Sequence, residues 1–365
     1  MIVIIGVVVA VVIATYFYMS QDLFGKKPEG ERLERMSKSS HFKDGVFENF
    51  HHTPTLTEGY SMMGVMYKQI FGKHPRTQPK DSIPSVVTDL KSFAPDENVL
   101  VWFGHSSYFI QLNGRKILVD PVFSGNASPI PSSVNAFPGA NGYGVEDMPD
   151  IDYLFISHDH YDHLDYQTIV AMKDKVRKVM CGLGVGSHFE LWGYTQDQII
   201  EGDWYDAVDL DDGFKAYFTP SRHFSGRGFK RNNTLWSSYV LEAEGFKLYI
   251  GGDSGYDTHF ADIGNKFGPF DLAILENGQY NKAWEAIHML PEQTLKAGSD
   301  LKAKRVFPVH SSKFKLAWHP WDEPLSEVSR LSADYNFPLV TPKIGEVVRL
   351  KDTTQTFDHW WEGME

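Results

Sequence analysis

An uncharged and almost wholly apolar stretch opens the chain over residues 2–18. As an α-helix rising about 1.5 Å per residue it would extend about 26 Å, close to the roughly 30 Å hydrocarbon core of a bilayer. The run Tyr16-Phe17-Tyr18 at its end suits a membrane interface. We therefore predict a transmembrane anchor over residues 1–20.

Basic residues follow the apolar stretch, whereas none precedes it. They are Lys26, Lys27, Arg32, Arg35 and Lys38. Since basic residues gather on the cytoplasmic side of a span, this asymmetry predicts a single-pass membrane protein whose large domain faces the cytoplasm. A cleaved signal peptide is disfavoured, because a basic n-region and an A-x-A cleavage site are both missing.

Residues 21–97 carry few periodic signals and are predicted to form a juxtamembrane linker and an N-terminal extension. Within them, residues 60–71 bring five apolar side chains near one face of a helix. These are Met62, Met63, Met66, Ile70 and Phe71. Such a face can belong to a core, or it can contact a membrane or an acyl chain, and the sequence leaves both readings open.

From residue 98 onward, short apolar runs alternate with turns rich in Gly and Asn. These runs predict strands at 99–103, 108–112, 116–120, 153–157, 178–181, 214–219, 237–242, 247–250, 272–275 and 305–309. Helices are expected at 166–176, 187–192, 291–299 and 325–336. The uneven mixture favours the α+β class, with two packed sheets flanked by helices over residues 98–350. Residues 351–365 form a C-terminal tail, whose Trp360-Trp361 pair is either an interfacial anchor or packed.

Composition narrows the chemistry further. The net charge of −12 argues against nucleic acid as a partner, because nucleic-acid-binding proteins normally present a basic face. There is one cysteine, Cys181, so an intrachain disulfide is excluded. Any metal site must therefore be built from His, Asp and Glu.

A dense group of such residues, His158-Asp159-His160-Tyr161-Asp162-His163, directly follows the apolar run 153–157. Because these residues leave a strand and enter a loop, their side chains can converge. We expect His158 and His160 to bind one metal, and Asp162 and His163 to turn toward a second. Imidazole and carboxylate ligands suit Zn²⁺, with Fe and Mn as chemical alternatives.

Three further candidates occupy matching positions at the carboxyl ends of predicted strands. His223 follows the strand 214–219, and His310 follows the strand 305–309. Asp253 follows Gly251 and Gly252, which permit close backbone approach. A carboxylate in this position could bridge two metals.

This ordered set resembles the metallo-β-lactamase fold hydrolases over roughly residues 98–350. The resemblance implies an αββα sandwich with two Zn²⁺ ions. It assigns His158, His160 and His223 to one metal, Asp162, His163 and His310 to the other, and Asp253 to both. Asp120 matches an early acidic residue that orients a ligand.

Other motifs are similar to one branch, the N-acylphosphatidylethanolamine-hydrolysing phospholipase D enzymes. They are Trp102-Phe-Gly-His105-Ser, Asn233-Thr-Leu-Trp236, Gly252-Asp-Ser-Gly-Tyr256 and Ile287-His288-Met-Leu-Pro-Glu292. The resemblance makes His288 a substrate-orienting or proton-transferring residue. Residues 278–284 depart from the phospholipase pattern, and soluble relatives carry similar motifs.

The resulting prediction is a membrane-anchored zinc phosphodiesterase that cleaves N-acylphosphatidylethanolamine into N-acylethanolamine and phosphatidic acid. Asp162, Asp253 and His288 are its predicted catalytic residues, and a membrane phospholipid is its partner. One alternative is a metal-dependent hydrolase of a soluble phosphodiester or lactone. A second alternative is a non-catalytic membrane scaffold. A homo-oligomer is compatible with the sequence.

Overall fold

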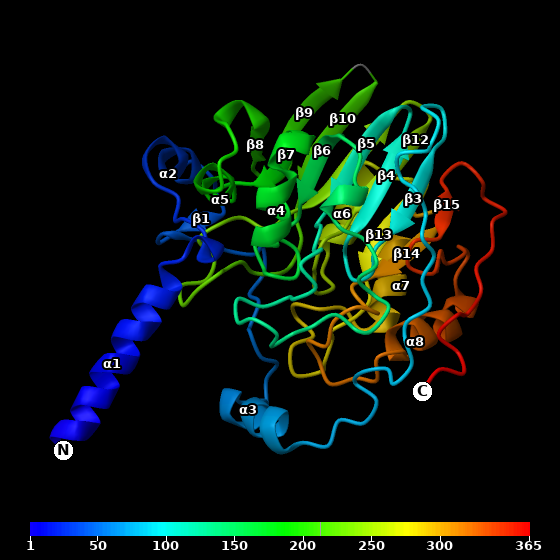
Figure 1. Cartoon of the computed structure of the whole chain (residues 1–365). Helices are drawn as coiled ribbons and strands as arrows, with labels where there is room; N and C mark the ends of the chain where they lie inside the picture. The colour runs from blue at the N-terminus through cyan, green and yellow to red at the C-terminus, as the bar shows by residue number, and fades with distance from the viewer. Residues whose placement is uncertain (212) are drawn as a thin grey trace.

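Two β-sheets lie face to face in the computed structural model, with helices covering their outer faces (Figure 1). The structure describes residues 1–211 and 213–365, and the side chains of all of these except Ile2, Gln69 and Ile70. The predicted α+β sandwich, with four layers in the order αββα, is confirmed.

The first sheet has seven strands in the order β15-β3-β4-β5-β6-β7-β8. Strands β3, β4 and β5 form an antiparallel meander, and β6, β7 and β8 continue it in parallel. Their bounds are β3 Val99–Trp102, β4 Tyr108–Leu112, β5 Arg115–Val119, β6 Ile151–Ile156, β7 Val176–Gly182, β8 Ile199–Gly202 and β15 Val347–Arg349. Cys181 lies in β7 and is fully buried.

The second sheet has six strands in the order β14-β13-β12-β11-β10-β9. Strands β9 to β12 are antiparallel, whereas β13 and β14 run parallel to β12. Their bounds are β9 Ala207–Asp211, β10 Phe214–Thr219, β11 Ser238–Ala243, β12 Phe246–Ile250, β13 Leu272–Glu276 and β14 Val306–Val309.

Helices cover the two outer faces. The bounds are α4 Tyr166–Met172 and α5 Gly186–Leu191 over the first sheet, and α6 His259–Lys266, α7 Pro291–Asp300 and α8 Glu323–Leu331 over the second. Short 3-10 turns are η2 Val145–Asp147, η3 Lys173–Lys175, η4 Gln196–Gln198 and η5 Ser332–Asp334. A continuous apolar core between the sheets includes Trp102, Phe155 and Tyr239.

Most predicted strands are present, and the elements that the sequence did not predict are short or polar. Strand β9 is a partly exposed edge strand with two aspartates, and β15 has three residues. Helix α6 mixes polar and apolar residues, so its one buried face was not recognised. Helix α4 ends at Met172, four residues before the predicted end, because η3 turns the chain into β7.

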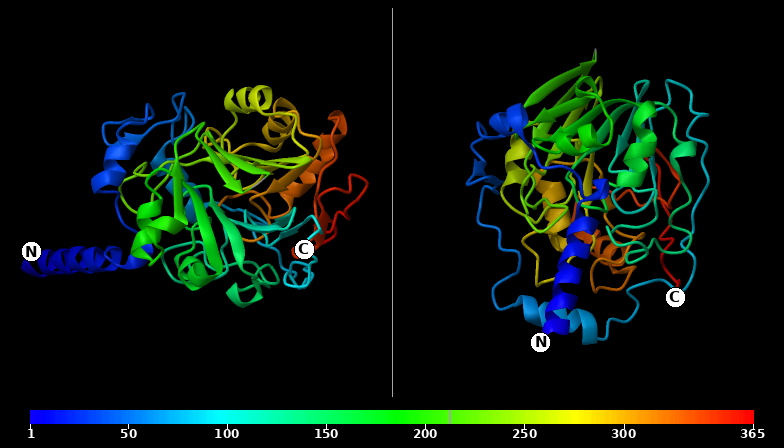
Figure 2. Two further views of the ribbon diagram at one scale, coloured as in Figure 1. Left: turned by 90° about the horizontal axis from the view of Figure 1, so that it is seen from above. Right: turned by 60° about the vertical axis from the view of Figure 1, so that its left-hand side comes forward.

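The N-terminal helix α1 (Ile2–Met19) projects away from the sandwich (Figures 1 and 2). Its apolar side chains are exposed, as Val3, Ile4 and Phe17 illustrate. In the part of the chain that the structure describes, we find no helix with both the length and the apolar character needed to cross a bilayer. The transmembrane helix of the predicted fold is therefore unconfirmed.

The next segment contains η1 Asp22–Phe24, α2 Gly30–Met36, β1 Phe42–Lys43 and β2 Val46–Phe47. These elements belong to the predicted juxtamembrane linker and N-terminal extension, and they pack against the sandwich. Met36 and Phe47 are buried, and Arg32 pairs with Glu190 and Glu201 of the first-sheet side. Helix α3 (Met62–Phe71) then lies below the sheets, with the side chains of Met62, Met63, Met66 and Phe71 exposed. The predicted contribution of Ile70 lies outside the described side chains.

The C-terminal tail returns to the sandwich. Trp360 and Trp361 are both buried in the core between the sheets. The indole nitrogen of Trp360 donates to the carbonyl of Pro342 at 3.2 Å. The packed alternative is therefore correct for this pair.

Candidate metal centre

The predicted ligands meet at the edge of the sandwich where strands from both sheets end. The loop 158–163 follows β6, and the other three positions follow β10, β12 and β14. Because both sheets deliver their strand ends to this edge, residues 150 positions apart in sequence become neighbours. All seven predicted ligands are among the groups whose nitrogen or oxygen atoms converge.

One group consists of His158, His160 and His223, whose ligand atoms lie within 4.8 Å of one another. His158 Nε2 is 2.8 Å from His160 Nδ1, and His223 Nε2 is 3.3 Å from the same atom. The other nitrogen of His223 donates to the carbonyl of Ile287 at 3.0 Å, if the neutral ring carries its proton on Nδ1. That arrangement leaves Nε2 free to bind a metal.

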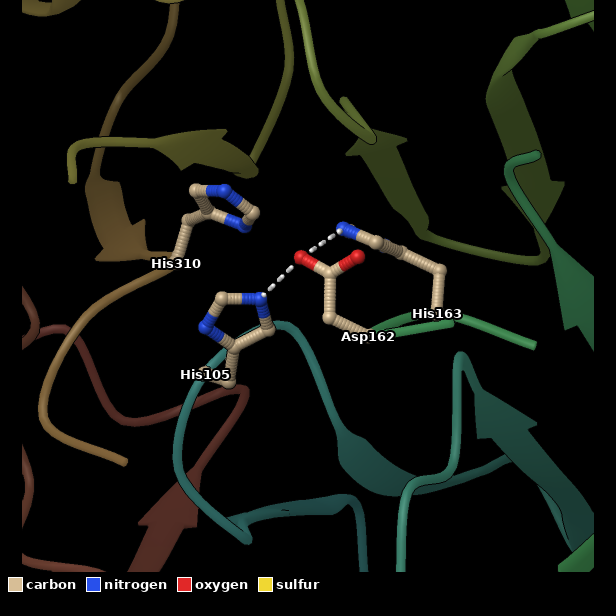
Figure 3. A group of neighbouring side chains, drawn as sticks. All are labelled: His105, Asp162, His163 and His310. Carbon is tan, nitrogen blue, oxygen red and sulfur yellow. Dashed lines mark hydrogen bonds and ion pairs between the residues drawn. The ribbon is translucent and has the colours of Figure 1, made fainter. Parts of the chain in front are cut away.

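The second group contains Asp162, His163 and His310, together with His105 (Figure 3). His105 Nε2 lies 2.9 Å from Asp162 Oδ2, and His163 Nε2 lies 3.5 Å from the same oxygen. His105 comes from the turn between β3 and β4, and it belongs to a predicted motif in which it has no assigned role. At this distance the ring can hold the Asp162 carboxylate in place.

The carboxylate of Asp253 touches both groups. Its Oδ2 lies 3.2 Å from His163 Nε2 and 3.8 Å from His223 Nε2. Its Oδ1 lies 3.0 Å from His310 Nδ1. The side chain therefore occupies the position expected of a shared ligand.

Asp120 lies behind the second group, as predicted for an orienting residue. Its Oδ2 accepts from His163 Nδ1 at 2.8 Å and from Ser157 Oγ at 2.6 Å. Its Oδ1 accepts from the backbone nitrogen of Ser157 at 2.8 Å. These bonds fix the ring of His163 so that Nε2 faces Asp253.

The donor set fits divalent metal ions. Burial lowers the pKa of His160 to about 4 and holds the pKa values of His158, His223 and His310 well below the usual range, so these rings are neutral ligands at pH 7. Burial alone would lower the pKa of His163 too, but nearby Asp253 and Asp162 raise it. The two carboxylates thus favour a positive charge at this position. Among the described residues, the buried His163 Nε2 has ion-pair contacts with them but no hydrogen bond of good geometry.

His288 lies beside this centre, with its ring 5.1 Å from that of His223 and 5.3 Å from that of His310. Its Nδ1 is 2.7 Å from Oε2 of Glu276, which is fully buried at the end of β13. Burial raises the pKa of Glu276 well above its ordinary range. Sequence reasoning missed Glu276, although its place at a strand end matches that of the ligands.

A cavity of about 290 Å³ opens onto these residues. Its polar part is formed by His160, Asp162, Asp253, His288, His310, Gln279, Thr55 and Arg231. Its apolar part is formed by Leu56, Met62, Val65, Phe224, Trp284, Ile287 and Leu316. Helix α3 thus supplies part of the wall through Met62 and Val65. Arg231, stacked at 4.6 Å on Phe224, brings a cation to the cavity.

Comparisons with known proteins agree with this geometry. A family model described as a beta-lactamase superfamily domain matches residues 115–311. An uncharacterized protein of Mycobacterium tuberculosis is 34% identical over 333 residues, which cover 89% of this chain and 88% of that protein. The N-acyl-phosphatidylethanolamine-hydrolyzing phospholipase D 1 of Caenorhabditis elegans is 28% identical over 66% of this chain and 74% of its own length.

Solved structures support the fold. The metallo hydrolase Igni18 of Ignicoccus hospitalis is similar with a TM-score of 0.53 at 22% identity, covering 69% of this chain and 97% of that protein. The family match spans β5 to the residue after His310, and therefore includes all seven predicted ligands. Fold, strand-end histidines and family match together identify this chain as a metal-dependent hydrolase of the metallo-β-lactamase superfamily.

Proposed function

We propose that this chain is a membrane-associated phosphodiesterase of the phospholipase D type that uses two zinc ions. Its substrate would be N-acylphosphatidylethanolamine, and its products N-acylethanolamine and phosphatidic acid. The observation that carries the proposal is the cavity, which joins a cluster of metal ligands to an apolar wall leading to an exposed helix.

The seven ligands would hold the metals as two sets that share one carboxylate. His158, His160 and His223 form one set, Asp162, His163 and His310 form the other, and Asp253 belongs to both. Zinc ions bound there would supply Lewis acidity toward the phosphate oxygens and lower the pKa of the attacking water.

The chain's own residues would bind the substrate and move its protons. Arg231 offers the phosphate a guanidinium beside the metal ligands. The contact between Glu276 and Nδ1 holds the ring of His288, so Nε2 is the nitrogen that can protonate the departing alcohol. The apolar wall would displace water from the rest of the cavity once an acyl chain lies against it.

The apolar wall supports a lipid substrate in place of a soluble one. It continues from Met62 and Val65 on the cavity side of α3 to Met63, Tyr67 and Phe71, which are 66–78% exposed. Exposed apolar side chains that adjoin a reaction cavity are typical of surfaces that meet lipid.

Helix α1 supports association with a membrane. Its valines and isoleucines are exposed. The helix runs toward the lower end of the molecule, where α3 lies, in Figure 1 and in the right-hand view of Figure 2. We propose that both helices contact one bilayer, with the sandwich on its cytoplasmic side. Extraction of membranes with alkaline carbonate, which releases surface-bound proteins only, tests whether α1 spans or lies on the bilayer.

The decisive experiment is a mass-spectrometric screen of the purified, zinc-loaded protein against phospholipids that include N-acylphosphatidylethanolamine. We expect free N-acylethanolamine from the wild type, and at least a hundredfold less from Asp162→Asn, with about half the bound zinc lost. Asp174→Asn is the matched control, because that carboxylate is 93% exposed. It precedes β7, whose first residue pairs with the start of β6, at the opposite end of that strand from the predicted ligands. Cleavage of a soluble bis-aryl phosphodiester without cleavage of any lipid would refute the lipid assignment and favour the soluble alternative.

A further inference from the structure

The chain between α1 and α2 is fastened to the back of the metal-binding loop. We define residues 22–26 as the strap and residues 158–164 as the metal loop. More than 130 positions separate them in sequence, yet two buried side chains, His188 and Arg227, hydrogen-bond to both.

His188 links the strap to Asp159, which stands between the ligands His158 and His160. The backbone nitrogen of Lys26 donates to His188 Nδ1 at 3.0 Å. An imidazole that accepts at Nδ1 must be neutral and carry its proton on Nε2, which then donates to Asp159 Oδ2 at 3.3 Å. Burial lowers the pKa of His188, in agreement with a neutral ring. The strap therefore selects the tautomer that Asp159 needs.

Arg227 makes the second link. Its Nε and Nη2 donate to the carbonyl of Leu23 at 3.0 and 2.6 Å. Its Nη1 donates to the carbonyls of Asp159 and Leu164, at 2.9 and 2.7 Å, near the two ends of the metal loop. The guanidinium also stacks on Tyr161 at 4.1 Å. One buried side chain thus ties the strap to three points of the loop.

The contact between the strap and the His188 ring leaves no room for a side chain at Gly25. Its φ is +74°, and a Cβ there would lie 2.1 Å from His188 Nδ1. Trp192 Nε1 and Ser187 Oγ close the contact by donating to the carbonyls of Asp22 and Lys26, at 2.8 and 2.7 Å. The strap thus makes specific contacts along its length. A tether that only joined α1 to the domain would not need them.

We propose that His188 and Arg227 are positioning residues for the metal centre and that the strap is part of its support. The inference rests on the metal site of the proposed function but not on its substrate. Since partners behind metal ligands change metal affinity by about 10- to 100-fold, disturbing the strap should weaken zinc binding without touching a ligand.

Zinc dissociation constants of full-length variants, measured by competition with a chromogenic chelator, test this proposal. Gly25→Ala should raise the constant of the weaker-binding zinc at least tenfold. Gly45→Ala is its matched control, because Gly45 has nearly the same φ of +78° with the nearest atom, Lys230 Nζ, 3.8 Å away. His188→Phe should act like Gly25→Ala, whereas His188→Gln should restore most of the affinity, since an amide can accept from Lys26 and donate to Asp159.

Loss of stability alone must be separated from loss of positioning. Val328→Ala, in the core behind the second sheet, supplies a destabilised chain with an undisturbed strap. Wild-type zinc affinity in folded Gly25→Ala and His188→Phe would overturn the inference, as would an equal loss of affinity in Val328→Ala. If the wild type itself bound no zinc, the proposed metal site would fall, which is a different result.

Discussion

At the scale of single residues, the sequence singles out the predicted ligands because they lie in loops that follow apolar strands. His158, His223 and His310 follow apolar runs, and Gly251 and Gly252 mark the turn before Asp253. Strand ends of both sheets meet at one edge, so residues with this placement become neighbours. The family resemblance divides them between two metals, and this division stays a prediction.

Two residues beside the ligands were not assigned from sequence. Glu276 is the last residue of β13. A carboxylate at the end of an apolar run normally indicates an exposed strand end, but Glu276 is fully buried. His105 has φ of +54° in a tight turn and contacts Asp162 only because the turn folds back over the site. The burial of a single carboxylate and the path of a tight turn do not change the periodic pattern of the sequence, so neither residue could be assigned from it.

Replacing His288 tests its proposed role in protonating the leaving group. His288→Asn should lower kcat on N-acylphosphatidylethanolamine by about 100-fold, in the range expected for loss of a general acid. A soluble bis(p-nitrophenyl) phosphate should lose less than fivefold, because nitrophenolate departs without a proton. Equal losses on both substrates, at unchanged zinc content, would contradict proton transfer and favour a role in binding.

At the scale of elements, the hydrophobic pattern predicts the buried strands but not the strands at the edges of the sheets. Strands β6 and β13 are almost fully buried runs that read as strands directly. Edge strands such as β9 pair on one side and keep polar residues, so their pattern resembles a loop. The polar segment before α2 contacts the sandwich through backbone carbonyls, such as that of Leu23. Composition does not indicate contacts of this kind.

Helix α3 offers a test of the lipid-facing surface. Replacing exposed Met63 and Phe71 by Gln together should reduce cleavage of the phospholipid in vesicles about tenfold, since apolar area would be lost from the bilayer contact. Activity on a soluble phosphodiester should stay within twofold, as both side chains are exposed and neither lines the cavity. Val87→Gln, at an equally exposed apolar position outside α1 and α3, is the control. Unchanged cleavage of vesicles by the double variant would contradict a membrane contact through α3.

At the scale of the whole molecule, Lys313 joins the two sheets from within. It follows β14 of the second sheet, and its ammonium group donates to the carbonyls of Phe103 and Val122, at 3.1 and 2.9 Å, on the side of the first sheet. Its side chain is fully buried, and burial lowers its pKa to about 7. No hydrophobic pattern or motif in the sequence predicts this link.

This buried lysine predicts how stability changes with pH. An unfolded lysine has a pKa of about 10.4, so between pH 7 and 10 the unfolded chain binds more protons than the folded one, and stability rises with pH. From pH 7 to 9, urea unfolding of the zinc-saturated wild type should gain at least about 1 kcal/mol relative to Lys313→Met. The difference between the two slopes removes contributions from other groups. Parallel slopes would mean that Lys313 is charged in the folded state over this range.

Labelling of the single cysteine can report when the strands around it separate. Cys181 is buried in β7 between β6, which leads into the metal loop, and β8. A thiol reagent can reach it only when that part of the sheet separates, so its labelling rate counts openings of the strands behind the metal centre. The labelling rate of Cys181 can be measured with zinc present and with zinc removed by a chelator. The ratio of the two rates would measure how much bound zinc stabilises this part of the sheet against opening.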